Sequence, residues 1–213
     1  MKMTFTVLSK SIKHGNKCVA GMKNDGTLIR IVSNDESIDG AIPNWFLKNS
    51  RYNIDVQILD DIEVDVIAPM PNETQAENYL VDINILPRVV GHRTLQDVIC
   101  KLHIDSDFYI FTNNSRFLNR NEALNAGYSL KLILANNIQI KQLDSYGKPK
   151  EKADFTYNNI RYNRISVTDS DYFGYERSFT SAILFLSLAH QPFETTDGEQ
   201  RYYKFIAKIY PLS

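Results

Sequence analysis

About a dozen short segments rich in Val, Ile, Tyr and Phe dominate the chain, among them TFTVL at 4–8, NIDVQIL at 53–59 and FYIFT at 108–112. Asn, Asp, Gly or Pro separates each segment from the next, which is the pattern of β-strands joined by turns. A helical spacing of apolar residues is clear only at 94–102, and a weaker helical segment precedes Gly127. The sequence therefore predicts a mainly β protein with one or two short helices.

Two predicted hairpins indicate an internal repeat. NDGTLIRIVSND at 24–35 and NNIRYNRISVTD at 158–169 each run from an Asn-rich turn through an Arg-Ile pair to an Asp. Two-residue turns at 25–26 and 158–159 would fix three cross-strand pairs. These pairs are Gly21 with Arg30, Ala153 with Arg164 and Phe155 with Tyr162. The alternative explanation is that the two segments are not related by duplication, because any two hairpins in an all-β protein share such turn residues.

A duplicated chain would give each half roughly 100 residues, five or six strands and one short helix, within the usual size of a small domain. Those proportions favour two Greek-key barrels of the OB type in tandem. The expected domains are a first OB-like barrel at 1–87, a partly helical connecting segment at 88–127 and a second OB-like barrel at 128–213. A single sandwich of about a dozen strands is the competing architecture.

The net charge of −1 argues neither for nor against a nucleic-acid partner, but the charges are unevenly spread. Residues 1–33 hold six Lys or Arg against one acid, whereas residues 34–82 hold two against eleven. The imbalance marks either a functional patch or two segments that pair in the fold. Because Cys18 and Cys100 lie far apart, no secretory leader is evident and the apolar run at 182–189 is too short to span a bilayer, we expect a cytoplasmic protein with no membrane role.

Several short motifs are spread over nearly the whole chain. They are S-x-K-H-G-x-x-C-V-A-G at 11–21, R-I-V-S at 30–33, Q-x-E-N at 75–78, T-D at 168–169 and Y-K-F-I-A at 203–207. With them the chain resembles the dual OB-containing domain family of bacteria. The resemblance implies two OB folds in tandem and a role in binding nucleic acid or a nucleotide, and it carries over no enzymatic activity. Where the family often has an aromatic residue before the arginine and a proline after it, this chain has Ile29 and Ile31.

Arg30 is the most informative single residue, because apolar residues surround it in its predicted strand. A buried guanidinium needs a partner. The partner is either an internal polar group, from the acidic strand at 60–66 or the cluster at 75–78, or a bound phosphate, which the planar guanidinium holds in bidentate fashion. The same alternatives apply to Arg164.

A binding site for nucleic acid would combine cations for phosphate with aromatic rings for bases. The first predicted strand connection carries several cations, and this loop grips ligands in OB folds. Aromatic residues alternate with cations on the second hairpin, although such a stripe also fills a barrel core. The expected phosphate-binding residues are Lys13, His14, Lys17, Arg30, Arg161 and Arg164, the expected base-stacking residues are Tyr157 and Tyr162, and the expected supporting polar residues are Ser11, Gln75, Glu77, Asn78 and Asp169.

Patterns for catalysis or cofactor binding are absent from the sequence. His14 and Cys18 have no evident third residue to orient the histidine, the four histidines lack zinc spacing, and no Gly-rich phosphate loop, G-x-S-x-G or H-E-x-x-H motif occurs. Asp60, Asp61, Glu63 and Asp65 could hold a Mg²⁺ ion, but alternation with Ile and Val is typical of a solvated strand face. We expect no catalytic residue, no metal and no cofactor.

Three hypotheses follow from these patterns. The first is a non-enzymatic protein that binds single-stranded nucleic acid or a nucleotide through two OB-like barrels. The second is a protein-interaction or scaffold module with a protein partner, in which the arginines are internal salt-bridge struts. The third is a metal-dependent nuclease that uses the acidic row at 61–65.

Overall fold

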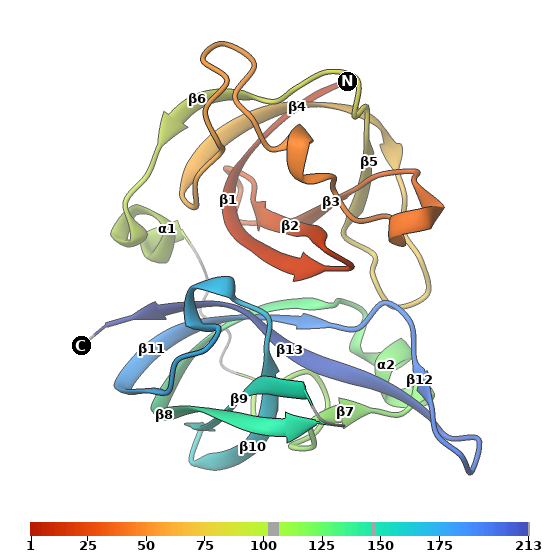
Figure 1. Cartoon of the computed structure of the whole chain (residues 1–213), viewed down its shortest axis with the longest axis vertical. Coiled ribbons are helices and arrows are strands. Elements are labelled where there is room, and N and C mark those ends of the chain that lie inside the picture. Colours follow the sequence, from red (N-terminus) through yellow and green to blue (C-terminus); the bar gives the residue numbers. More distant parts are fainter. Residues whose placement is uncertain (102–106, 146–147, 213) are drawn as a thin grey trace. The chain divides into compact units, whose positions relative to one another are not determined.

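Strands make up most of the computed structural model, which describes residues 1–101, 107–145 and 148–212 (Figure 1). The chain divides into two units, one of Met1–Asn72 with Ala76–His103 and the other of Glu73–Gln75 with Ile104–Ser213. The prediction of a mainly β protein with two short helices is confirmed. The predicted strands at 53–59 and 108–112 are wrong, since both segments are irregular.

The first unit is a closed barrel of five strands with one added strand. β1 pairs with β2 and with β4, and β3 joins β2 in an antiparallel pair and β5 in a parallel pair, so the order β1-β2-β3-β5-β4 returns to β1. This is the topology of an OB fold. The elements are β1 (Lys2–Lys13), β2 (Asn16–Met22), β3 (Leu28–Val32), η1 (Glu36–Ile38), η2 (Asn44–Phe46), β4 (Asp60–Pro69), β5 (Asn78–Val81), β6 (Arg88–His92) and α1 (Leu95–Lys101).

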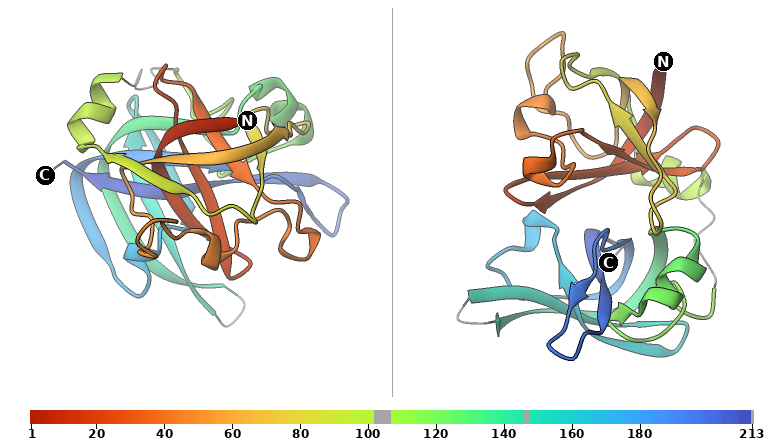
Figure 2. Two further views of the ribbon diagram at one scale, coloured as in Figure 1. Left: turned by 90° about the horizontal axis from the view of Figure 1, so that it is seen from above. Right: turned by 90° about the vertical axis from the view of Figure 1, so that its right-hand side faces the viewer.

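The second unit repeats this topology. β8 pairs with β9 and β11, β10 pairs with β9 and runs parallel to β13, and β13 pairs with β11, which closes the order β8-β9-β10-β13-β11. The hairpin of β12 and the start of β13 extends past the barrel strands in Figure 1 and in the left view of Figure 2. The elements are β7 (Phe117–Leu118), α2 (Arg120–Ala126), β8 (Leu130–Ser145), β9 (Lys148–Tyr157), β10 (Ile160–Val167), η3 (Ser170–Tyr172), β11 (Arg177–Leu188), β12 (Phe193–Glu194) and β13 (Gln200–Pro211).

The internal repeat of the sequence occupies the same place in both barrels. Each copy forms the turn between the second and third strands and then the third strand, which pairs in parallel with the fifth. Each copy ends at an aspartate that caps a 3₁₀ helix: Asp35 accepts a hydrogen bond from the Ser37 N–H at 3.0 Å and Asp169 accepts one from the Asp171 N–H at 3.2 Å. The chain is therefore a structural duplication.

The expected connecting segment at 88–127 is divided between the two units. β6 pairs with β4 and so belongs to the first sheet, whereas β7 pairs with β13 of the second. α1 begins behind the predicted capping box, in which Thr94 and Asp97 exchange hydrogen bonds at 2.9 and 3.2 Å, and residue 102 of the predicted helix lies outside the described residues. α2 ends at Gly127 with a φ of 71°, as expected for a glycine stop.

The second hairpin has the predicted two-residue turn. Asn158 and Asn159 have φ values of 48° and 60°, and Phe155 lies opposite Tyr162 as predicted. A bulge follows, in which Arg164 has a φ of 56°, so Ala153 pairs with Ile165. The predicted pair of Ala153 with Arg164 is therefore wrong.

The first hairpin has a three-residue loop instead of the predicted two-residue turn. The Lys23 N–H donates to the Thr27 carbonyl at 2.9 Å, and Gly26 takes the left-handed position with a φ of 87°. The register shifts by one residue, and Ala20 lies opposite Arg30. Gly21 makes room for β1, because a Cβ at this position would lie 2.1 Å from the Thr6 carbonyl oxygen.

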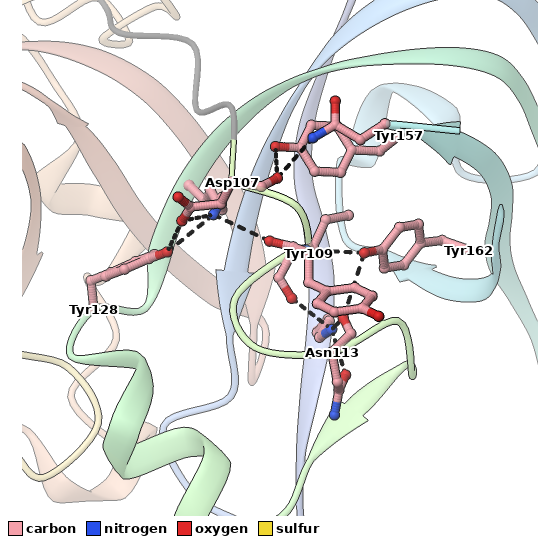
Figure 3. Close-up of polar contacts among 10 residues, drawn as sticks. Asp107, Tyr109, Asn113, Tyr128, Tyr157 and Tyr162 are labelled. Atoms are coloured by element: carbon pink, nitrogen blue, oxygen red, sulfur yellow. Dashed lines mark hydrogen bonds and ion pairs between the residues drawn. The ribbon is translucent and has the colours of Figure 1, made fainter. Parts of the chain in front are cut away.

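The segment at 107–113 covers the end of the second barrel where β8 and β10 begin (Figure 3). This segment forms no strand, so its peptide groups need other partners. Lys204 of β13 donates to the carbonyls of Ile110 and Asn113 at 2.8 and 2.7 Å, and the Tyr162 hydroxyl accepts from the Ile110 N–H at 3.0 Å. Lys131 of β8 donates to the carboxylate of Asp107 at 2.9 Å. Two buried ammonium groups therefore anchor the segment.

Lys204 should make the stability depend on pH. Burial lowers the pKa of this lysine to about 7, whereas the unfolded chain holds the proton up to its ordinary pKa near 10.5. Between these values the unfolded state binds more protons, so the free energy of unfolding should rise with pH from about 7 to about 9.5. We expect urea titrations to show this rise in the wild type and a flatter profile in Lys204→Met. Lys141→Met, at an exposed lysine, should keep the wild-type slope, and equal slopes for all three proteins would contradict this role of Lys204.

Gly21→Ala tests the close approach of β1 and β2. The added methyl group would clash with backbone, so we expect a loss of roughly 1–3 kcal/mol or more in the free energy of unfolding. Gly15→Asn is the control, because Gly15 has a φ of 74°, open space around it and a conformation that Asn tolerates. Equal stability of the two variants in denaturant titrations would show that β1 does not constrain Gly21.

Candidate nucleic-acid interface

The tyrosines of the second hairpin point into the barrel. Tyr157 and Tyr162 are 2% and 0% exposed, and Tyr162 stacks on Phe155 with the ring centres 5.4 Å apart. Figure 3 shows both hydroxyl groups directed at the segment at 107–113, where Tyr157 donates to the Asp107 carbonyl at 2.6 Å. The prediction that these rings stack a base is wrong, because the strand alternation assigns them to the core.

The same alternation turns the cations of the hairpin outward. Lys152 of β9 lies opposite Ser166 of β10 and donates to its hydroxyl at 2.6 Å, and Ser166 lies opposite Phe205 of β13. Lys150 lies two residues before Lys152 and shares its face. The outer surface of β9, β10 and β13 therefore carries positive charge at one side and an aromatic residue at the other.

Three aromatic rings continue this outer surface across β7, β13 and β12. Tyr203, on the same face of β13 as Phe205, lies opposite Phe117 of β7, and its ring centre is 5.8 Å from that of Phe117 and 6.3 Å from that of Phe193. Phe193 is 57% exposed, and Phe117 and Tyr203 are half-buried. We call Phe117, Phe193 and Tyr203 the aromatic platform.

Two guanidinium groups flank the aromatic platform. Arg116 lies 5.9 Å from the Tyr203 ring centre, and Arg201 lies 4.7 Å from that of Phe117 and forms an ion pair with Glu199 at 2.8 Å. Arg116 also lies close enough to Lys152 of β9 to act on its charge, as Lys150 does. Burial and then the charges of Lys150 and Arg116 lower the pKa of Lys152, so these three cations are close enough to repel one another. A bound anion would relieve that repulsion.

This surface lies where OB folds bind their ligands. The binding face of an OB fold is the outer surface of the second and third strands, bounded by the loops between strands one and two and between strands four and five. Here these strands are β9 and β10, and β12 lies in the connection between the fourth and fifth strands. The loop at 146–147 lies outside the described residues.

Three of the four residues predicted to bind phosphate in the first barrel, Lys13, His14 and Lys17, lie at the turn between β1 and β2. Lys13 forms an ion pair with Asp39 at 2.9 Å, and the His14 ring lies 3.7 Å from the same carboxylate. Lys17 pairs through its backbone with Ile42. The structure thus brings the three predicted residues together but gives two of them a carboxylate partner.

Arg30 is buried and paired inside the first barrel. Its Nη1 lies 3.3 Å from the Glu77 carboxylate and donates to the Asn78 side chain at 3.0 Å. The structure therefore corrects its assignment to phosphate contact and favours the internal partner at 75–78. Gln75 is buried, and its amide donates to the Leu188 carbonyl at 3.2 Å.

The remaining predicted residues divide into exposed and buried positions. Arg161 and Arg164 are exposed near Asp154, which lies 3.9 Å from the Arg161 guanidinium and accepts from the Arg164 N–H at 2.8 Å. Asp169 is buried: burial raises its pKa, while it accepts from the Ile209 N–H at 3.0 Å and pairs with Lys208 at 3.2 Å. Ser11 is also buried, opposite Cys18 in the β1–β2 pair.

Two of the three carboxylates of the acidic row on β4 pair with neighbouring cations. Asp61 pairs with Arg93 at 2.9 Å, and Glu63 pairs with Lys2 at 2.8 Å and with Arg88 at 3.2 Å. No group of three or more metal-ligating side chains is found in the part of the chain that the structure describes. The row therefore gives no support to a metal-dependent nuclease.

Sequence reasoning missed the aromatic platform. Its rings come from residues 117, 193 and 203, which only the pairing of β7 and β12 with β13 brings together. The motif at 203–207 was the one signal that included any of them.

Two closed barrels of one topology, with cations and aromatic rings on an outer face of the second, define a tandem OB-fold protein of the binding-module type. The chain belongs to the dual OB-containing domain family, whose profile matches residues 3–209. Searches among curated proteins and among solved structures found no match. Within the described residues, no helix is long and apolar enough to cross a membrane.

The variant Arg30→Ala tests whether Arg30 stabilises the fold through its internal ion pair with Glu77 or instead contacts a ligand. The substitution leaves Glu77 buried without its guanidinium, so we expect a loss of about 3–5 kcal/mol in the free energy of unfolding, measured in urea. Replacing both partners, Arg30→Met with Glu77→Leu, should cost less than the single change. Arg161→Ala, at an exposed arginine, should cost no more than about 1 kcal/mol. A fully stable Arg30→Ala protein would contradict the strut.

Proposed function

We propose that the protein binds single-stranded nucleic acid across the outer face of its second barrel. The observation that carries the proposal is the aromatic platform beside the cations Arg116, Lys150 and Lys152 on one solvent-facing surface. A base stacked on an aromatic side chain contributes about 1–3 kcal/mol and is accepted whatever its sequence, while cations follow the phosphates. The surface also lies at the ligand face of OB folds in general.

The charges support one placement of the strand. Glu199 pairs with Arg201 beside the β12 hairpin, so the positive charge of Arg201 at that edge of the platform is already balanced by a carboxylate. Arg116 and the two lysines of β9 carry the positive charge at the other side. The phosphates of a strand whose bases stack on the platform are therefore expected to run toward β9, where no carboxylate partner of Lys150 or Lys152 is found among the described residues.

A protein-interaction module is the second candidate function. It is favoured by the buried pair of Arg30 and Glu77, since that hypothesis expects the arginines to be internal struts. The two functions differ in their response to oligonucleotides, because docking of a protein partner requires no phosphate contact.

Binding of a labelled oligothymidylate tests the proposal. We expect fluorescence anisotropy to detect binding at about 50 mM salt and the affinity to fall as salt rises, because bound phosphates release counterions. Phe193→Ala should weaken binding by roughly 5- to 100-fold if its ring stacks a base. Arg116→Gln should reduce the slope of log K against log salt by about 0.7 if it contacts one phosphate.

Tyr175→Ala is the matched control for Phe193→Ala. Tyr175 is equally exposed, at 57%, belongs to the same barrel and lies against Arg177 at 5.5 Å, but it is not part of the platform. The control should bind as the wild type does. No binding at about 50 mM salt, or an affinity indifferent to salt, would contradict phosphate-driven binding.

A further inference from the structure

The first barrel holds one tryptophan outward on a rigid segment. Trp45 is 54% exposed in η2, whereas the residues on both sides of the exposed Asn44–Trp45 pair are buried. Ile42 and Phe46 are 0% exposed and fix the backbone in the core. The Trp45 ring meets the ring of Phe46 edge-on, at 6.4 Å between ring centres and an interplanar angle of 81°. An outward tryptophan in so constrained a segment is preorganised for contact.

Two interactions place this segment against the turn between β1 and β2. Ile42 and Lys17 exchange two backbone hydrogen bonds, at 3.0 and 2.8 Å, and the Asn44 amide donates to the Gly15 carbonyl at 2.8 Å. The turn therefore lies beside η2: Gly15, next to the exposed His14, is hydrogen-bonded to the residue just before Trp45, and Lys17 is hydrogen-bonded to the residue three positions before it. Neither His14 nor Lys17 is needed by the core.

The local charges favour an anionic ligand. Asp39 is the carboxylate of this region that faces the turn, and Lys13 holds it at 2.9 Å. Lys17 has no ion pair among the described residues, so its positive charge remains for a ligand. Gly15 has open space around it, which lets a ligand approach the backbone of the turn. An aromatic face beside a cation matches a nucleotide, which has a flat base and a phosphate.

We infer that Trp45 and Lys17 form a nucleotide-binding subsite of the first barrel, in which the indole stacks a base and the ammonium contacts its phosphate. The subsite takes one nucleotide of a single strand and is separate from the aromatic platform of the second barrel. This inference rests on the proposed function for the class of ligand, but it concerns different residues of a different unit.

The single tryptophan of the chain gives a direct readout. The probe is the same oligothymidylate, titrated at about 50 mM salt while tryptophan emission and oligonucleotide anisotropy are followed together. Stacking should quench the emission in step with the rise in anisotropy. Trp45→Ala should weaken binding by roughly 5- to 100-fold, the loss of one stacked base. Trp45→Phe should restore most of the affinity, because the aromatic face is kept.

Tyr52→Ala is the matched control in the same barrel. Tyr52 is 61% exposed and lies 5.1 Å from the Arg51 guanidinium, so it is also an exposed ring beside a cation. Its loss should leave both the affinity and the quenching unchanged. Lys17→Gln should lower the salt slope by about 0.7 for one lost phosphate contact and leave the folded state intact.

The outcomes separate the subsite from the proposed function. If no oligonucleotide binds by anisotropy, the proposed function and the subsite both fail. If the oligonucleotide binds but the tryptophan emission does not change and Trp45→Ala binds as the wild type does, the subsite alone fails. Equal losses in Trp45→Ala and Tyr52→Ala would also overturn the subsite, because the effect would then be common to exposed aromatic rings.

Discussion

Closure of each sheet through the parallel pairing of its third and fifth strands is the constraint on which the rest of the structure depends. β3 with β5, and β10 with β13, convert an open meander into a barrel with one inside and one outside. Every second side chain of each strand must then fill the interior, and its neighbours must face outward. The candidate binding surface consists of side chains that closure leaves outside: Lys150 and Lys152 on β9 and Tyr203 on β13.

Closure also explains which parts of the fold could be predicted. The alternation of apolar residues identified most strands, and the repeat of Asn-rich turn, Arg-Ile and Asp identified two equivalent halves, because both depend on residues close together in sequence. The register of the strand pairs was harder to predict. Gly26 adds one residue to the first loop, and the bulge at Arg164 shifts the pairing of β9 with β10 by one residue. Periodicity does not report such single-residue shifts.

The candidate site was less predictable than the fold. Sequence reasoning found an aromatic and cationic hairpin, but Tyr157 and Tyr162 belong to the core, and the rings that face solvent come from Phe117, Phe193 and Tyr203. Only tertiary pairing joins those three. The sequence indicated that Arg30 needs either an internal polar partner or a bound phosphate, and its buried ion pair with Glu77 favours the internal partner. Pairing of distant charges is a property of the folded chain and is absent from local patterns.

The anchoring of the segment at 107–113 has a consequence for how the protein is made. The segment precedes every barrel strand of the second unit in the chain, yet the carbonyls of Ile110 and Asn113 are held by Lys204 on the last of them, β13. The ribosome therefore synthesises the two acceptor carbonyls about ninety residues before the lysine that donates to them. At typical elongation rates of about 5–20 residues per second, that is a delay on the order of 5–20 seconds. During synthesis the first barrel can close on its own strands, while in the second barrel the carbonyls of Ile110 and Asn113 must wait for the final strand before they meet their lysine donor.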